Sequence, residues 1–161
     1  MFLAEEYKFV PVGNDIDLSS AAANDCDSIN MENYHHATFI VGFQDIGVAA
    51  CYVALYSGAT DGAKTSALTF HYAFGGAAQA SASCDVLAAW STSAMLTVAH
   101  ATYDNYMLII EAPATIMDLA NNENWLTLSF LDTDGGLTGN VQVHAILKPR
   151  YGGNRSVTAL T

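Results

Sequence analysis

Short runs of apolar and β-branched residues with alternating character make up most of the chain from residue 34 onwards. In one of them, Leu68, Phe70, Tyr72 and Phe74 alternate with polar or small residues, so these four side chains would share one face of a strand. Runs of this kind occupy 37–43, 48–56, 67–74, 79–86, 94–99, 106–111, 125–131 and 140–147. About eight short strands separated by Gly, Asp, Asn and Ser loops predict an all-β fold, an antiparallel sandwich or barrel.

The two ends of the chain lack this texture. Residues 1–33 show little apolar periodicity, which predicts an extended N-terminal arm or a loosely paired first strand. We therefore expect an arm over 1–33, a β-sandwich domain over 34–148 and a C-terminal tail over 149–161. Only 115–122 has helical character, and it is at most two turns long.

Composition limits the classes of partner. The chain has 161 residues and is 52% hydrophobic, which is enough for one domain with a real core. Only 13% of the residues are charged, against about 25% in typical soluble domains, so part of the surface is expected to face other protein. The net charge of -11 argues against nucleic acid and against anionic membranes as partners.

The few charges are unevenly distributed. Residues 1–45 hold many acids and one cation, Lys8, whereas the last stretch holds Lys148, Arg150 and Arg155 and no acid. Ends of opposite sign suggest that one end meets the other, within a subunit or between neighbours; the alternative is two solvated tails. The first residues lack the basic and apolar regions of a secretory signal, so a soluble protein made and kept in a cytoplasm is expected.

Candidate chemistry is sparse. The adjacent His35 and His36 would point to opposite faces of a strand, which disfavours joint metal binding. The segment 132–136 resembles a fragment of a calcium loop but lacks its later ligands, so a turn is expected; an acidic arm that binds Ca²⁺ loosely between subunits is the alternative. No nucleophile or phosphate-loop motif is present, and we predict neither an enzyme nor a cofactor.

Cysteine and tryptophan suggest packing rather than chemistry. The three cysteines are far apart and fit neither a disulfide framework nor a zinc site; Cys51, in an apolar run, is expected to be a buried thiol. Trp90, Trp125 and the tyrosines are interpreted as core or interface residues, with a sugar-binding platform as the alternative.

Several pieces, in order, carry a family resemblance over about residues 34–155. They are Tyr34-His35-His36-Ala37-Thr38-Phe39, a Gly62-Ala63-Lys64 loop that leads into a strand, Tyr106-Met107-Leu108-Ile109-Ile110-Glu111, Asp118-Leu119-Ala120-Asn121, and a last strand that runs into Arg150-Tyr151. In this order the chain resembles the small virion structural proteins of tailed bacteriophages, of the head decoration or cement type.

The resemblance implies a β-sandwich of jelly-roll type, a homotrimer, that binds the major capsid protein on the capsid exterior and bridges neighbouring subunits after assembly in the host cytoplasm. Capsid or subunit contacts are then expected at Phe2, Leu3, Tyr7, Phe9, Val10, Lys148, Arg150, Tyr151 and Arg155. Removal of residues 1–12 is expected to weaken capsid binding and leave the sandwich folded. The alternatives are another virion component (a head–tail joining or tail protein) and a carbohydrate-binding β-sandwich with Trp90 or Trp125 exposed.

Overall fold

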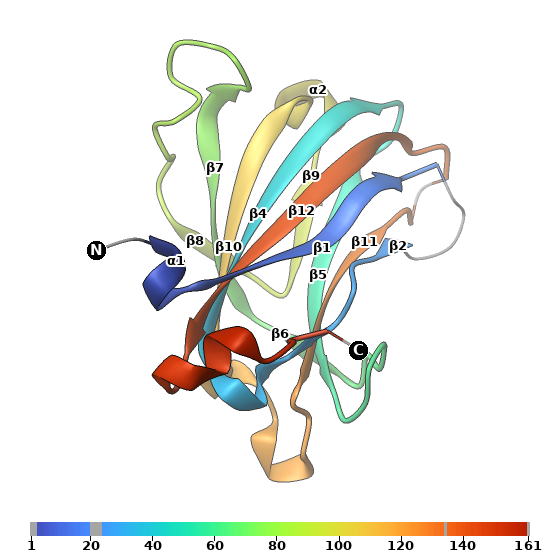
Figure 1. Ribbon diagram of the computed structural model, residues 1–161. Helices are drawn as coiled ribbons and strands as arrows, with labels where there is room; N and C mark the ends of the chain where they lie inside the picture. The colour runs from blue at the N-terminus through green and yellow to red at the C-terminus, as the bar shows by residue number, and fades with distance from the viewer. Residues whose placement is uncertain (1–2, 20–23, 134, 161) are drawn as a thin grey trace.

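Two antiparallel sheets packed face to face form the molecule (Figure 1). The computed structural model describes residues 3–19, 24–133 and 135–160. Sheet A has the order β1-β12-β4-β10-β7-β8, and sheet B has the order β2-β11-β5-β6, with β3 paired to β11 and β9 paired to β5. The predicted all-β sandwich is thus confirmed, while its jelly-roll type stays a prediction.

The strands and the short helical turns follow one another along the chain as follows. Sheet A is built from β1 (Lys8–Asp17), β4 (Tyr34–Gly47), β7 (Phe70–Ala78), β8 (Ser91–Ser93), β10 (Tyr106–Pro113) and β12 (Thr138–Pro149). Sheet B is built from β2 (Asn24–Asp25), β3 (Ile29–Asn30), β5 (Cys51–Gly58), β6 (Ser66–Leu68), β9 (Met95–Val98) and β11 (Trp125–Leu131). The helical turns are α1 (Leu3–Glu6), η1 (Met31–Asn33), α2 (His100–Tyr103), η2 (Ala114–Ile116), η3 (Leu119–Asn121) and η4 (Gly152–Ser156).

The core lies between the sheets and follows from the alternation in the sequence. Along β4, Phe39, Val41 and Phe43 are fully buried, while the residues between them remain partly exposed. On β11 the buried Phe130 meets Phe43 edge to face, with ring centroids 6.2 Å apart. This contact joins the two sheets directly.

Three expected segments differ from their prediction. The run 67–74 is divided between β6 in sheet B and β7 in sheet A, because the chain passes from one sheet to the other at Thr69. Most of 79–86 forms turns instead of a strand, held by bonds such as that from the Gly76 amide to the Val86 carbonyl at 2.7 Å. The expected helix over 115–122 is replaced by the short 3₁₀ turns η2 and η3.

The N-terminal segment is part of the sandwich. From Lys8, β1 pairs with β12 at the edge of sheet A, and Val10 and Val12 are buried in the core. Further along, β2 and β3 pair with β11 in sheet B. Of the two predictions for 1–33, the paired first strand therefore describes Lys8–Asp17, and residue 33 does not mark where the sandwich begins.

The C-terminal residues fold back onto the start of β4. The Tyr34 hydroxyl donates to the carbonyls of Asn154 and Val157, at 3.2 and 3.3 Å. The Arg150 amide donates to the Asn33 carbonyl at 2.9 Å, and Ala159 is buried. The predicted tail is thus docked on the domain. No helix in the described ranges is long and apolar enough to cross a membrane.

Truncation tests the assignment of the N-terminal segment. Removal of residues 1–6 ends before β1, and the described part of that segment, Leu3–Glu6, buries no side chain, so the free energy of unfolding should change by less than about 1 kcal/mol. Removal of 1–12 also deletes Val10 and Val12, each worth about 1.5–3 kcal/mol of burial, and should lower that free energy by at least about 3 kcal/mol. Urea unfolding of both truncated proteins checks this; equal stability of the two would contradict the pairing.

Candidate functional site

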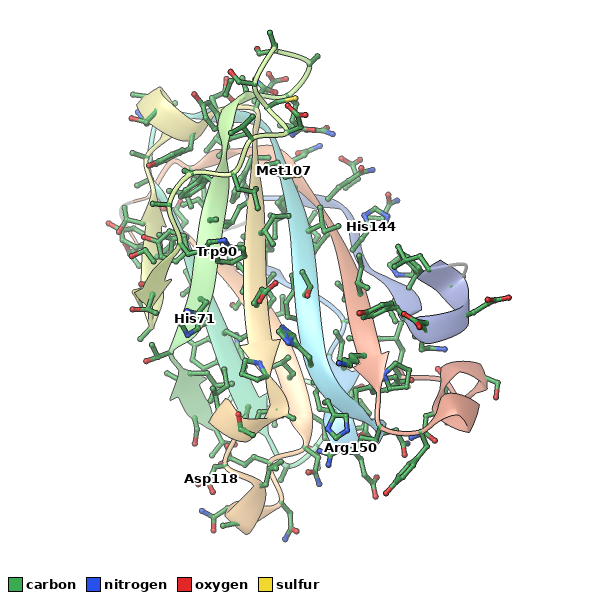
Figure 2. The ribbon with its side chains drawn as sticks, turned by 90° about the vertical axis from the view of Figure 1, so that its left-hand side faces the viewer. His71, Trp90, Met107, Asp118, His144 and Arg150 are labelled. Atoms are coloured by element: carbon green, nitrogen blue, oxygen red, sulfur yellow. The ribbon has the colours of Figure 1, made fainter. Side chains whose placement is uncertain are left out.

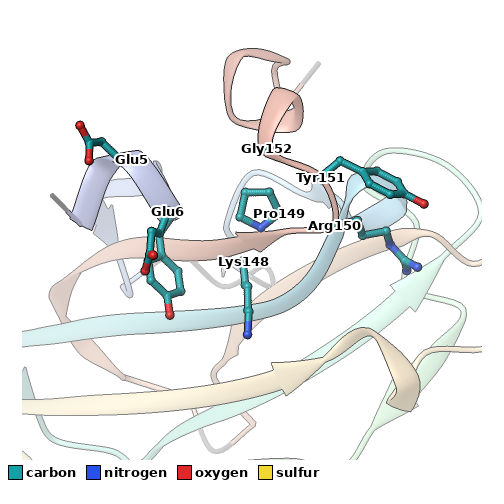
Figure 3. Close-up of a pocket in the computed structure, with 8 residues that line it drawn as sticks. Glu5, Glu6, Lys148, Pro149, Arg150, Tyr151 and Gly152 are labelled. Atoms are coloured by element: carbon teal, nitrogen blue, oxygen red, sulfur yellow. The ribbon is translucent and has the colours of Figure 1, made fainter. Parts of the chain in front are cut away.

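A cleft lies where the first helix meets the end of the last strand. It has a volume of about 360 Å³ and is lined by Glu5, Glu6, Tyr7, Lys148, Pro149, Arg150, Tyr151 and Gly152. Figure 3 shows Lys148 and Pro149 between α1 on one side and Tyr151 on the other. The acidic N-terminal residues and the basic C-terminal residues therefore line one cleft within a single chain.

A second cleft of about 260 Å³ adjoins the first on the outer face of sheet A. Its lining is Tyr7, His36, Thr38, Glu111, Ile146 and Lys148. Tyr7 and Lys148 line both clefts, so the two form one continuous groove from the tail onto the sheet. Three adjacent strands, β4, β10 and β12, supply the floor of its second half, because they place alternate side chains outward at the same level.

The groove contains one weak ion pair with an imidazole. His36 Nε2 lies 3.7 Å from Glu111 Oε2, which is too long for a hydrogen bond, and Nε2 is buried with no hydrogen-bond partner. Burial lowers the pKa of His36 below its ordinary value of 6.5, and the nearby Lys148 adds to this, while Glu111 opposes it. The neutral imidazole is therefore the form that the folded protein favours.

Four of the nine predicted contact residues line this groove. Tyr7, Lys148, Arg150 and Tyr151 line its first half. Outside the groove, Leu3 is 56% exposed and Phe9 50% exposed. Those two side chains are free to contact a partner.

The three remaining predicted contacts are Val10, Phe2 and Arg155. Val10 is 4% exposed and belongs to the core, so its expected contact outside the domain is wrong: its place on β1 points it between the sheets. Phe2 lies outside the described residues, as does the side chain of Arg155.

Arg150 and Tyr151 follow β12, and their side chains differ in how far the domain already holds them. Arg150 Nε donates to the Tyr34 carbonyl at 3.2 Å, so part of its guanidinium is already used within the domain. Tyr151 is 74% exposed and presents an open ring (Figure 3). A partner would thus meet a fixed guanidinium beside an exposed aromatic side chain.

Sequence reasoning missed His36, Thr38, Glu111 and Ile146 as members of one site. The signal was present in part, since Glu111 is the one charged residue of its apolar run and must point away from the core. The sequence pattern did not show that β4, β10 and β12 are neighbours, because only the strand order of the folded sheet brings them together.

The outer face of sheet B is covered by the chain itself over β11, although Met95 and Thr97 on β9 stay exposed. Thr127 and Ser129 alternate with core residues on β11 and so face away from the core, yet both are fully buried. Ser129 donates to Asp25 at 2.5 Å, and the hydroxyls of Thr127 and Ser28 are 2.6 Å apart. Lys64 Nζ lies 2.9 Å from Asp25 Oδ2.

A buried carboxylate fastens one end of sheet B. Glu123 is 4% exposed and accepts hydrogen bonds from the hydroxyls of Ser57, at 2.6 Å, and Ser66, at 3.1 Å. These bonds join the segment before β11 to the hairpin of β5 and β6. The arrangement satisfies the carboxylate, which accounts for its burial without a catalytic role.

The expected turn at 132–136 is confirmed by its hydrogen bonds. Asp132 accepts from the amides of Gly135, at 2.8 Å, and Leu137, at 3.0 Å. Gly135 and Gly136 have φ of 77° and 89°, which glycine adopts without strain. Over the ranges that the structure describes, no group of three or more His, Cys, Asp or Glu side chains could hold a metal ion.

Comparison with models of known protein families, with characterised proteins and with solved structures found no match to this chain. The function must therefore be argued from the surfaces described above.

Replacement of His36 tests the environment of the groove. Because the folded state lowers the pKa of His36, its contribution to stability is present above about pH 6.5 and is lost as the pH falls through the lowered value. His36→Gln should therefore flatten the decline of Tm between about pH 7 and pH 5. His35→Gln, at the exposed neighbouring position, is the matched control. Parallel curves for wild type and His36→Gln would refute the assignment.

Thiol labelling tests the burial of the cysteines. Cys26 and Cys51 are buried, and Cys84 is partly exposed. Burial raises the pKa of Cys26, and it raises that of Cys51 to about 12, so neither forms the reactive thiolate at pH 8. One thiol per chain should react quickly, and Cys84→Ser should abolish that fast phase. Rapid reaction of a second thiol in the folded protein would be the opposite result.

Proposed function

We propose that this protein is a structural virion protein that binds the outside of a phage capsid through the groove between α1 and the C-terminal segment. The resemblance described above suggests the class of partner. The observation that carries the proposal is that Tyr7 lines one cleft with Lys148, Arg150 and Tyr151, since the N-terminal residue is more than 140 positions from the other three.

The chemistry of the groove suits a protein surface better than a small molecule. Sites for small molecules are mostly apolar in their lining, whereas this cleft carries Glu5, Glu6, Lys148 and Arg150. Tyrosine and arginine are enriched where proteins meet, and the open ring of Tyr151 is a candidate anchor. Charges of both signs side by side would select a partner with a complementary pattern.

Binding to empty capsids tests the proposal. Purified protein is mixed with empty heads of a candidate tailed phage, and the bound fraction is measured by co-sedimentation at a series of concentrations. Wild type should move into the head fraction, and Tyr151→Ala combined with Lys148→Ala should weaken binding tenfold or more. Removal of residues 1–6, which takes away Leu3 and leaves β1, should also weaken it.

A matched control is Thr97→Ala on β9, an exposed position of sheet B remote from the groove in the strand order. Heads that leave the wild-type protein in solution would argue against capsid binding. Equal binding of wild type and the double variant would argue against the groove. The number of copies per particle separates shell decoration, with hundreds, from a joining ring, with six or twelve.

One observation favours a second candidate, a carbohydrate-binding β-sandwich. Trp90, directly before β8, is 46% exposed, and an exposed indole is a common platform for a sugar ring. Figure 2 places Trp90 beside β7, on the same side of the molecule as His71. A glycan array probed with wild type and Trp90→Ala separates the two candidates: loss of a specific signal in the variant would support the second.

A further inference from the structure

One edge of sheet A is open, apolar and free of charge. It is formed by residues 86–92, the edge segment, which lies along β7 and leads into β8, the last strand in the order of that sheet (Figure 1). Every residue of the edge segment is exposed, including the large apolar side chains of Val86, Leu87 and Trp90. The whole stretch 86–103 contains no Asp, Glu, Lys or Arg.

The edge segment is held firmly against β7. The Ala88 amide donates to the Phe74 carbonyl at 2.8 Å, and the Gly76 amide donates to the Val86 carbonyl at 2.7 Å. The turn before the segment also packs closely on this strand, since a Cβ atom at Gly75 would lie only 2.6 Å from the carbonyl oxygen of the preceding turn. The edge is therefore already in place before any partner binds, which lowers the cost of binding.

These bonds use only one side of the backbone. Leu87 forms a bridge with Gly75 through the hydrogen bonds of neighbouring residues, so its own N–H and C=O point away from β7. Within the described ranges, the backbone groups of Leu87, Ala89 and Trp90 have no hydrogen-bond partner. Such a row of unpaired groups at a sheet edge can accept the strand of another chain.

The opposite edge of sheet A is protected against such pairing. It is formed by β1, which carries the charges of Lys8, Asp15 and Asp17 and the proline Pro11, and whose register with β12 shifts on both sides of Gly13. Charges, proline and bulges are the means by which natural edge strands avoid pairing. The edge segment contains neither a charge nor a proline. Pairing there would join two sheets and stop, because the far edge of each is blocked.

We propose that two copies of this chain pair edge to edge and antiparallel, about a two-fold axis at Ala89. Sheet A would then continue from one copy into the other, and the two Ala89 residues would exchange their backbone hydrogen bonds. The sequence is complementary to itself in side-chain size about this position. The facing pairs are Trp90 with Ala88, Leu87 with Ser91, and Val86 with Thr92.

Charge favours a second copy as the occupant of this edge. With a net charge of -11, copies repel one another where acids face acids, and the edge segment holds none. The nearest acid in sequence, Asp85, lies on opposite sides of the axis in the two copies, so the two carboxylates do not face each other. A basic partner would find no carboxylate within the segment. The proposal does not depend on capsid binding, because it concerns the purified chain alone.

The first test is the mass of purified variants by sedimentation equilibrium. Because the paired segment is short, we expect a dissociation constant of roughly 10–100 µM, and wild type should approach twice 17.1 kDa at about 500 µM. Ala89→Glu and Ala89→Lys each place like charges opposite one another at the axis, and each should weaken association about fivefold or more. An equimolar mixture of the two variants should restore association, because unlike charges then face each other.

The matched controls are Ala120→Glu and Ala120→Lys, which make the same changes at an exposed alanine of η3, near the Asp118 that Figure 2 shows far from Trp90. They should leave the mass unchanged. Circular dichroism establishes that each variant is folded. Wild type that stays monomeric over the whole range would overturn the proposal and leave the edge to a strand of another protein. So would unchanged association of folded Ala89→Glu, or a mixture that associates no more tightly than either variant alone.

The second test is a disulfide across the axis. Facing residues of antiparallel strands have Cα atoms about 4.5–5.5 Å apart, which is within the range of a disulfide. In a Cys84→Ser background the remaining native cysteines are buried, so Ala89→Cys supplies the accessible thiol. Mild oxidation should convert this variant to a covalent dimer at least tenfold faster than Ala120→Cys in the same background. Equal rates for the two variants would contradict a two-fold axis at Ala89.

Discussion

The register of β4 is the constraint on which the rest of the molecule depends. Phe39, Val41 and Phe43 point inward, and β12 and β10 hydrogen-bond to the two sides of the same strand. Because side chains alternate with a period of two, a slip of one residue would expose these three and bury Thr38 and Ile40 instead. The same alternation that builds the core therefore decides which side chains form the outer face of sheet A and the floor of the groove.

The positions of most strands could be predicted from the sequence, whereas the order in which the strands pair within the sheets could not. Alternation located β4, β5, β10, β11 and β12 to within a few residues, because each buries one face on a common core. It did not reveal that 67–74 passes between sheets at Thr69, since local pattern is the same on either side of a crossover. For the site, charge asymmetry correctly suggested that the ends meet, whereas His36 and Glu111 came together only through the strand order.

The outer faces of the two sheets differ in how far the chain itself covers them. On sheet B, the chain itself covers the hydroxyl residues Thr127 and Ser129 of β11, and Ser28 and Asp25 give these two hydroxyls hydrogen-bond partners. On sheet A, Ile40 and Ile109 point outward and remain partly exposed, while Gln79 lies over Gly42 and the outward Ala73 is buried.

The position of β12 has a consequence for how the chain is made. This strand lies between β1 and β4, although it ends at Pro149 and β1 begins at Lys8. During translation β1 therefore has no hydrogen-bonding neighbour in its sheet until β12, about 120 residues further along the sequence, has left the ribosome. Val10 and Val12 would remain uncovered for that time, and pairing of such distant segments is slow. Sheet A is therefore completed only when β12 arrives, and the emerging chain is most exposed to aggregation just before that strand arrives.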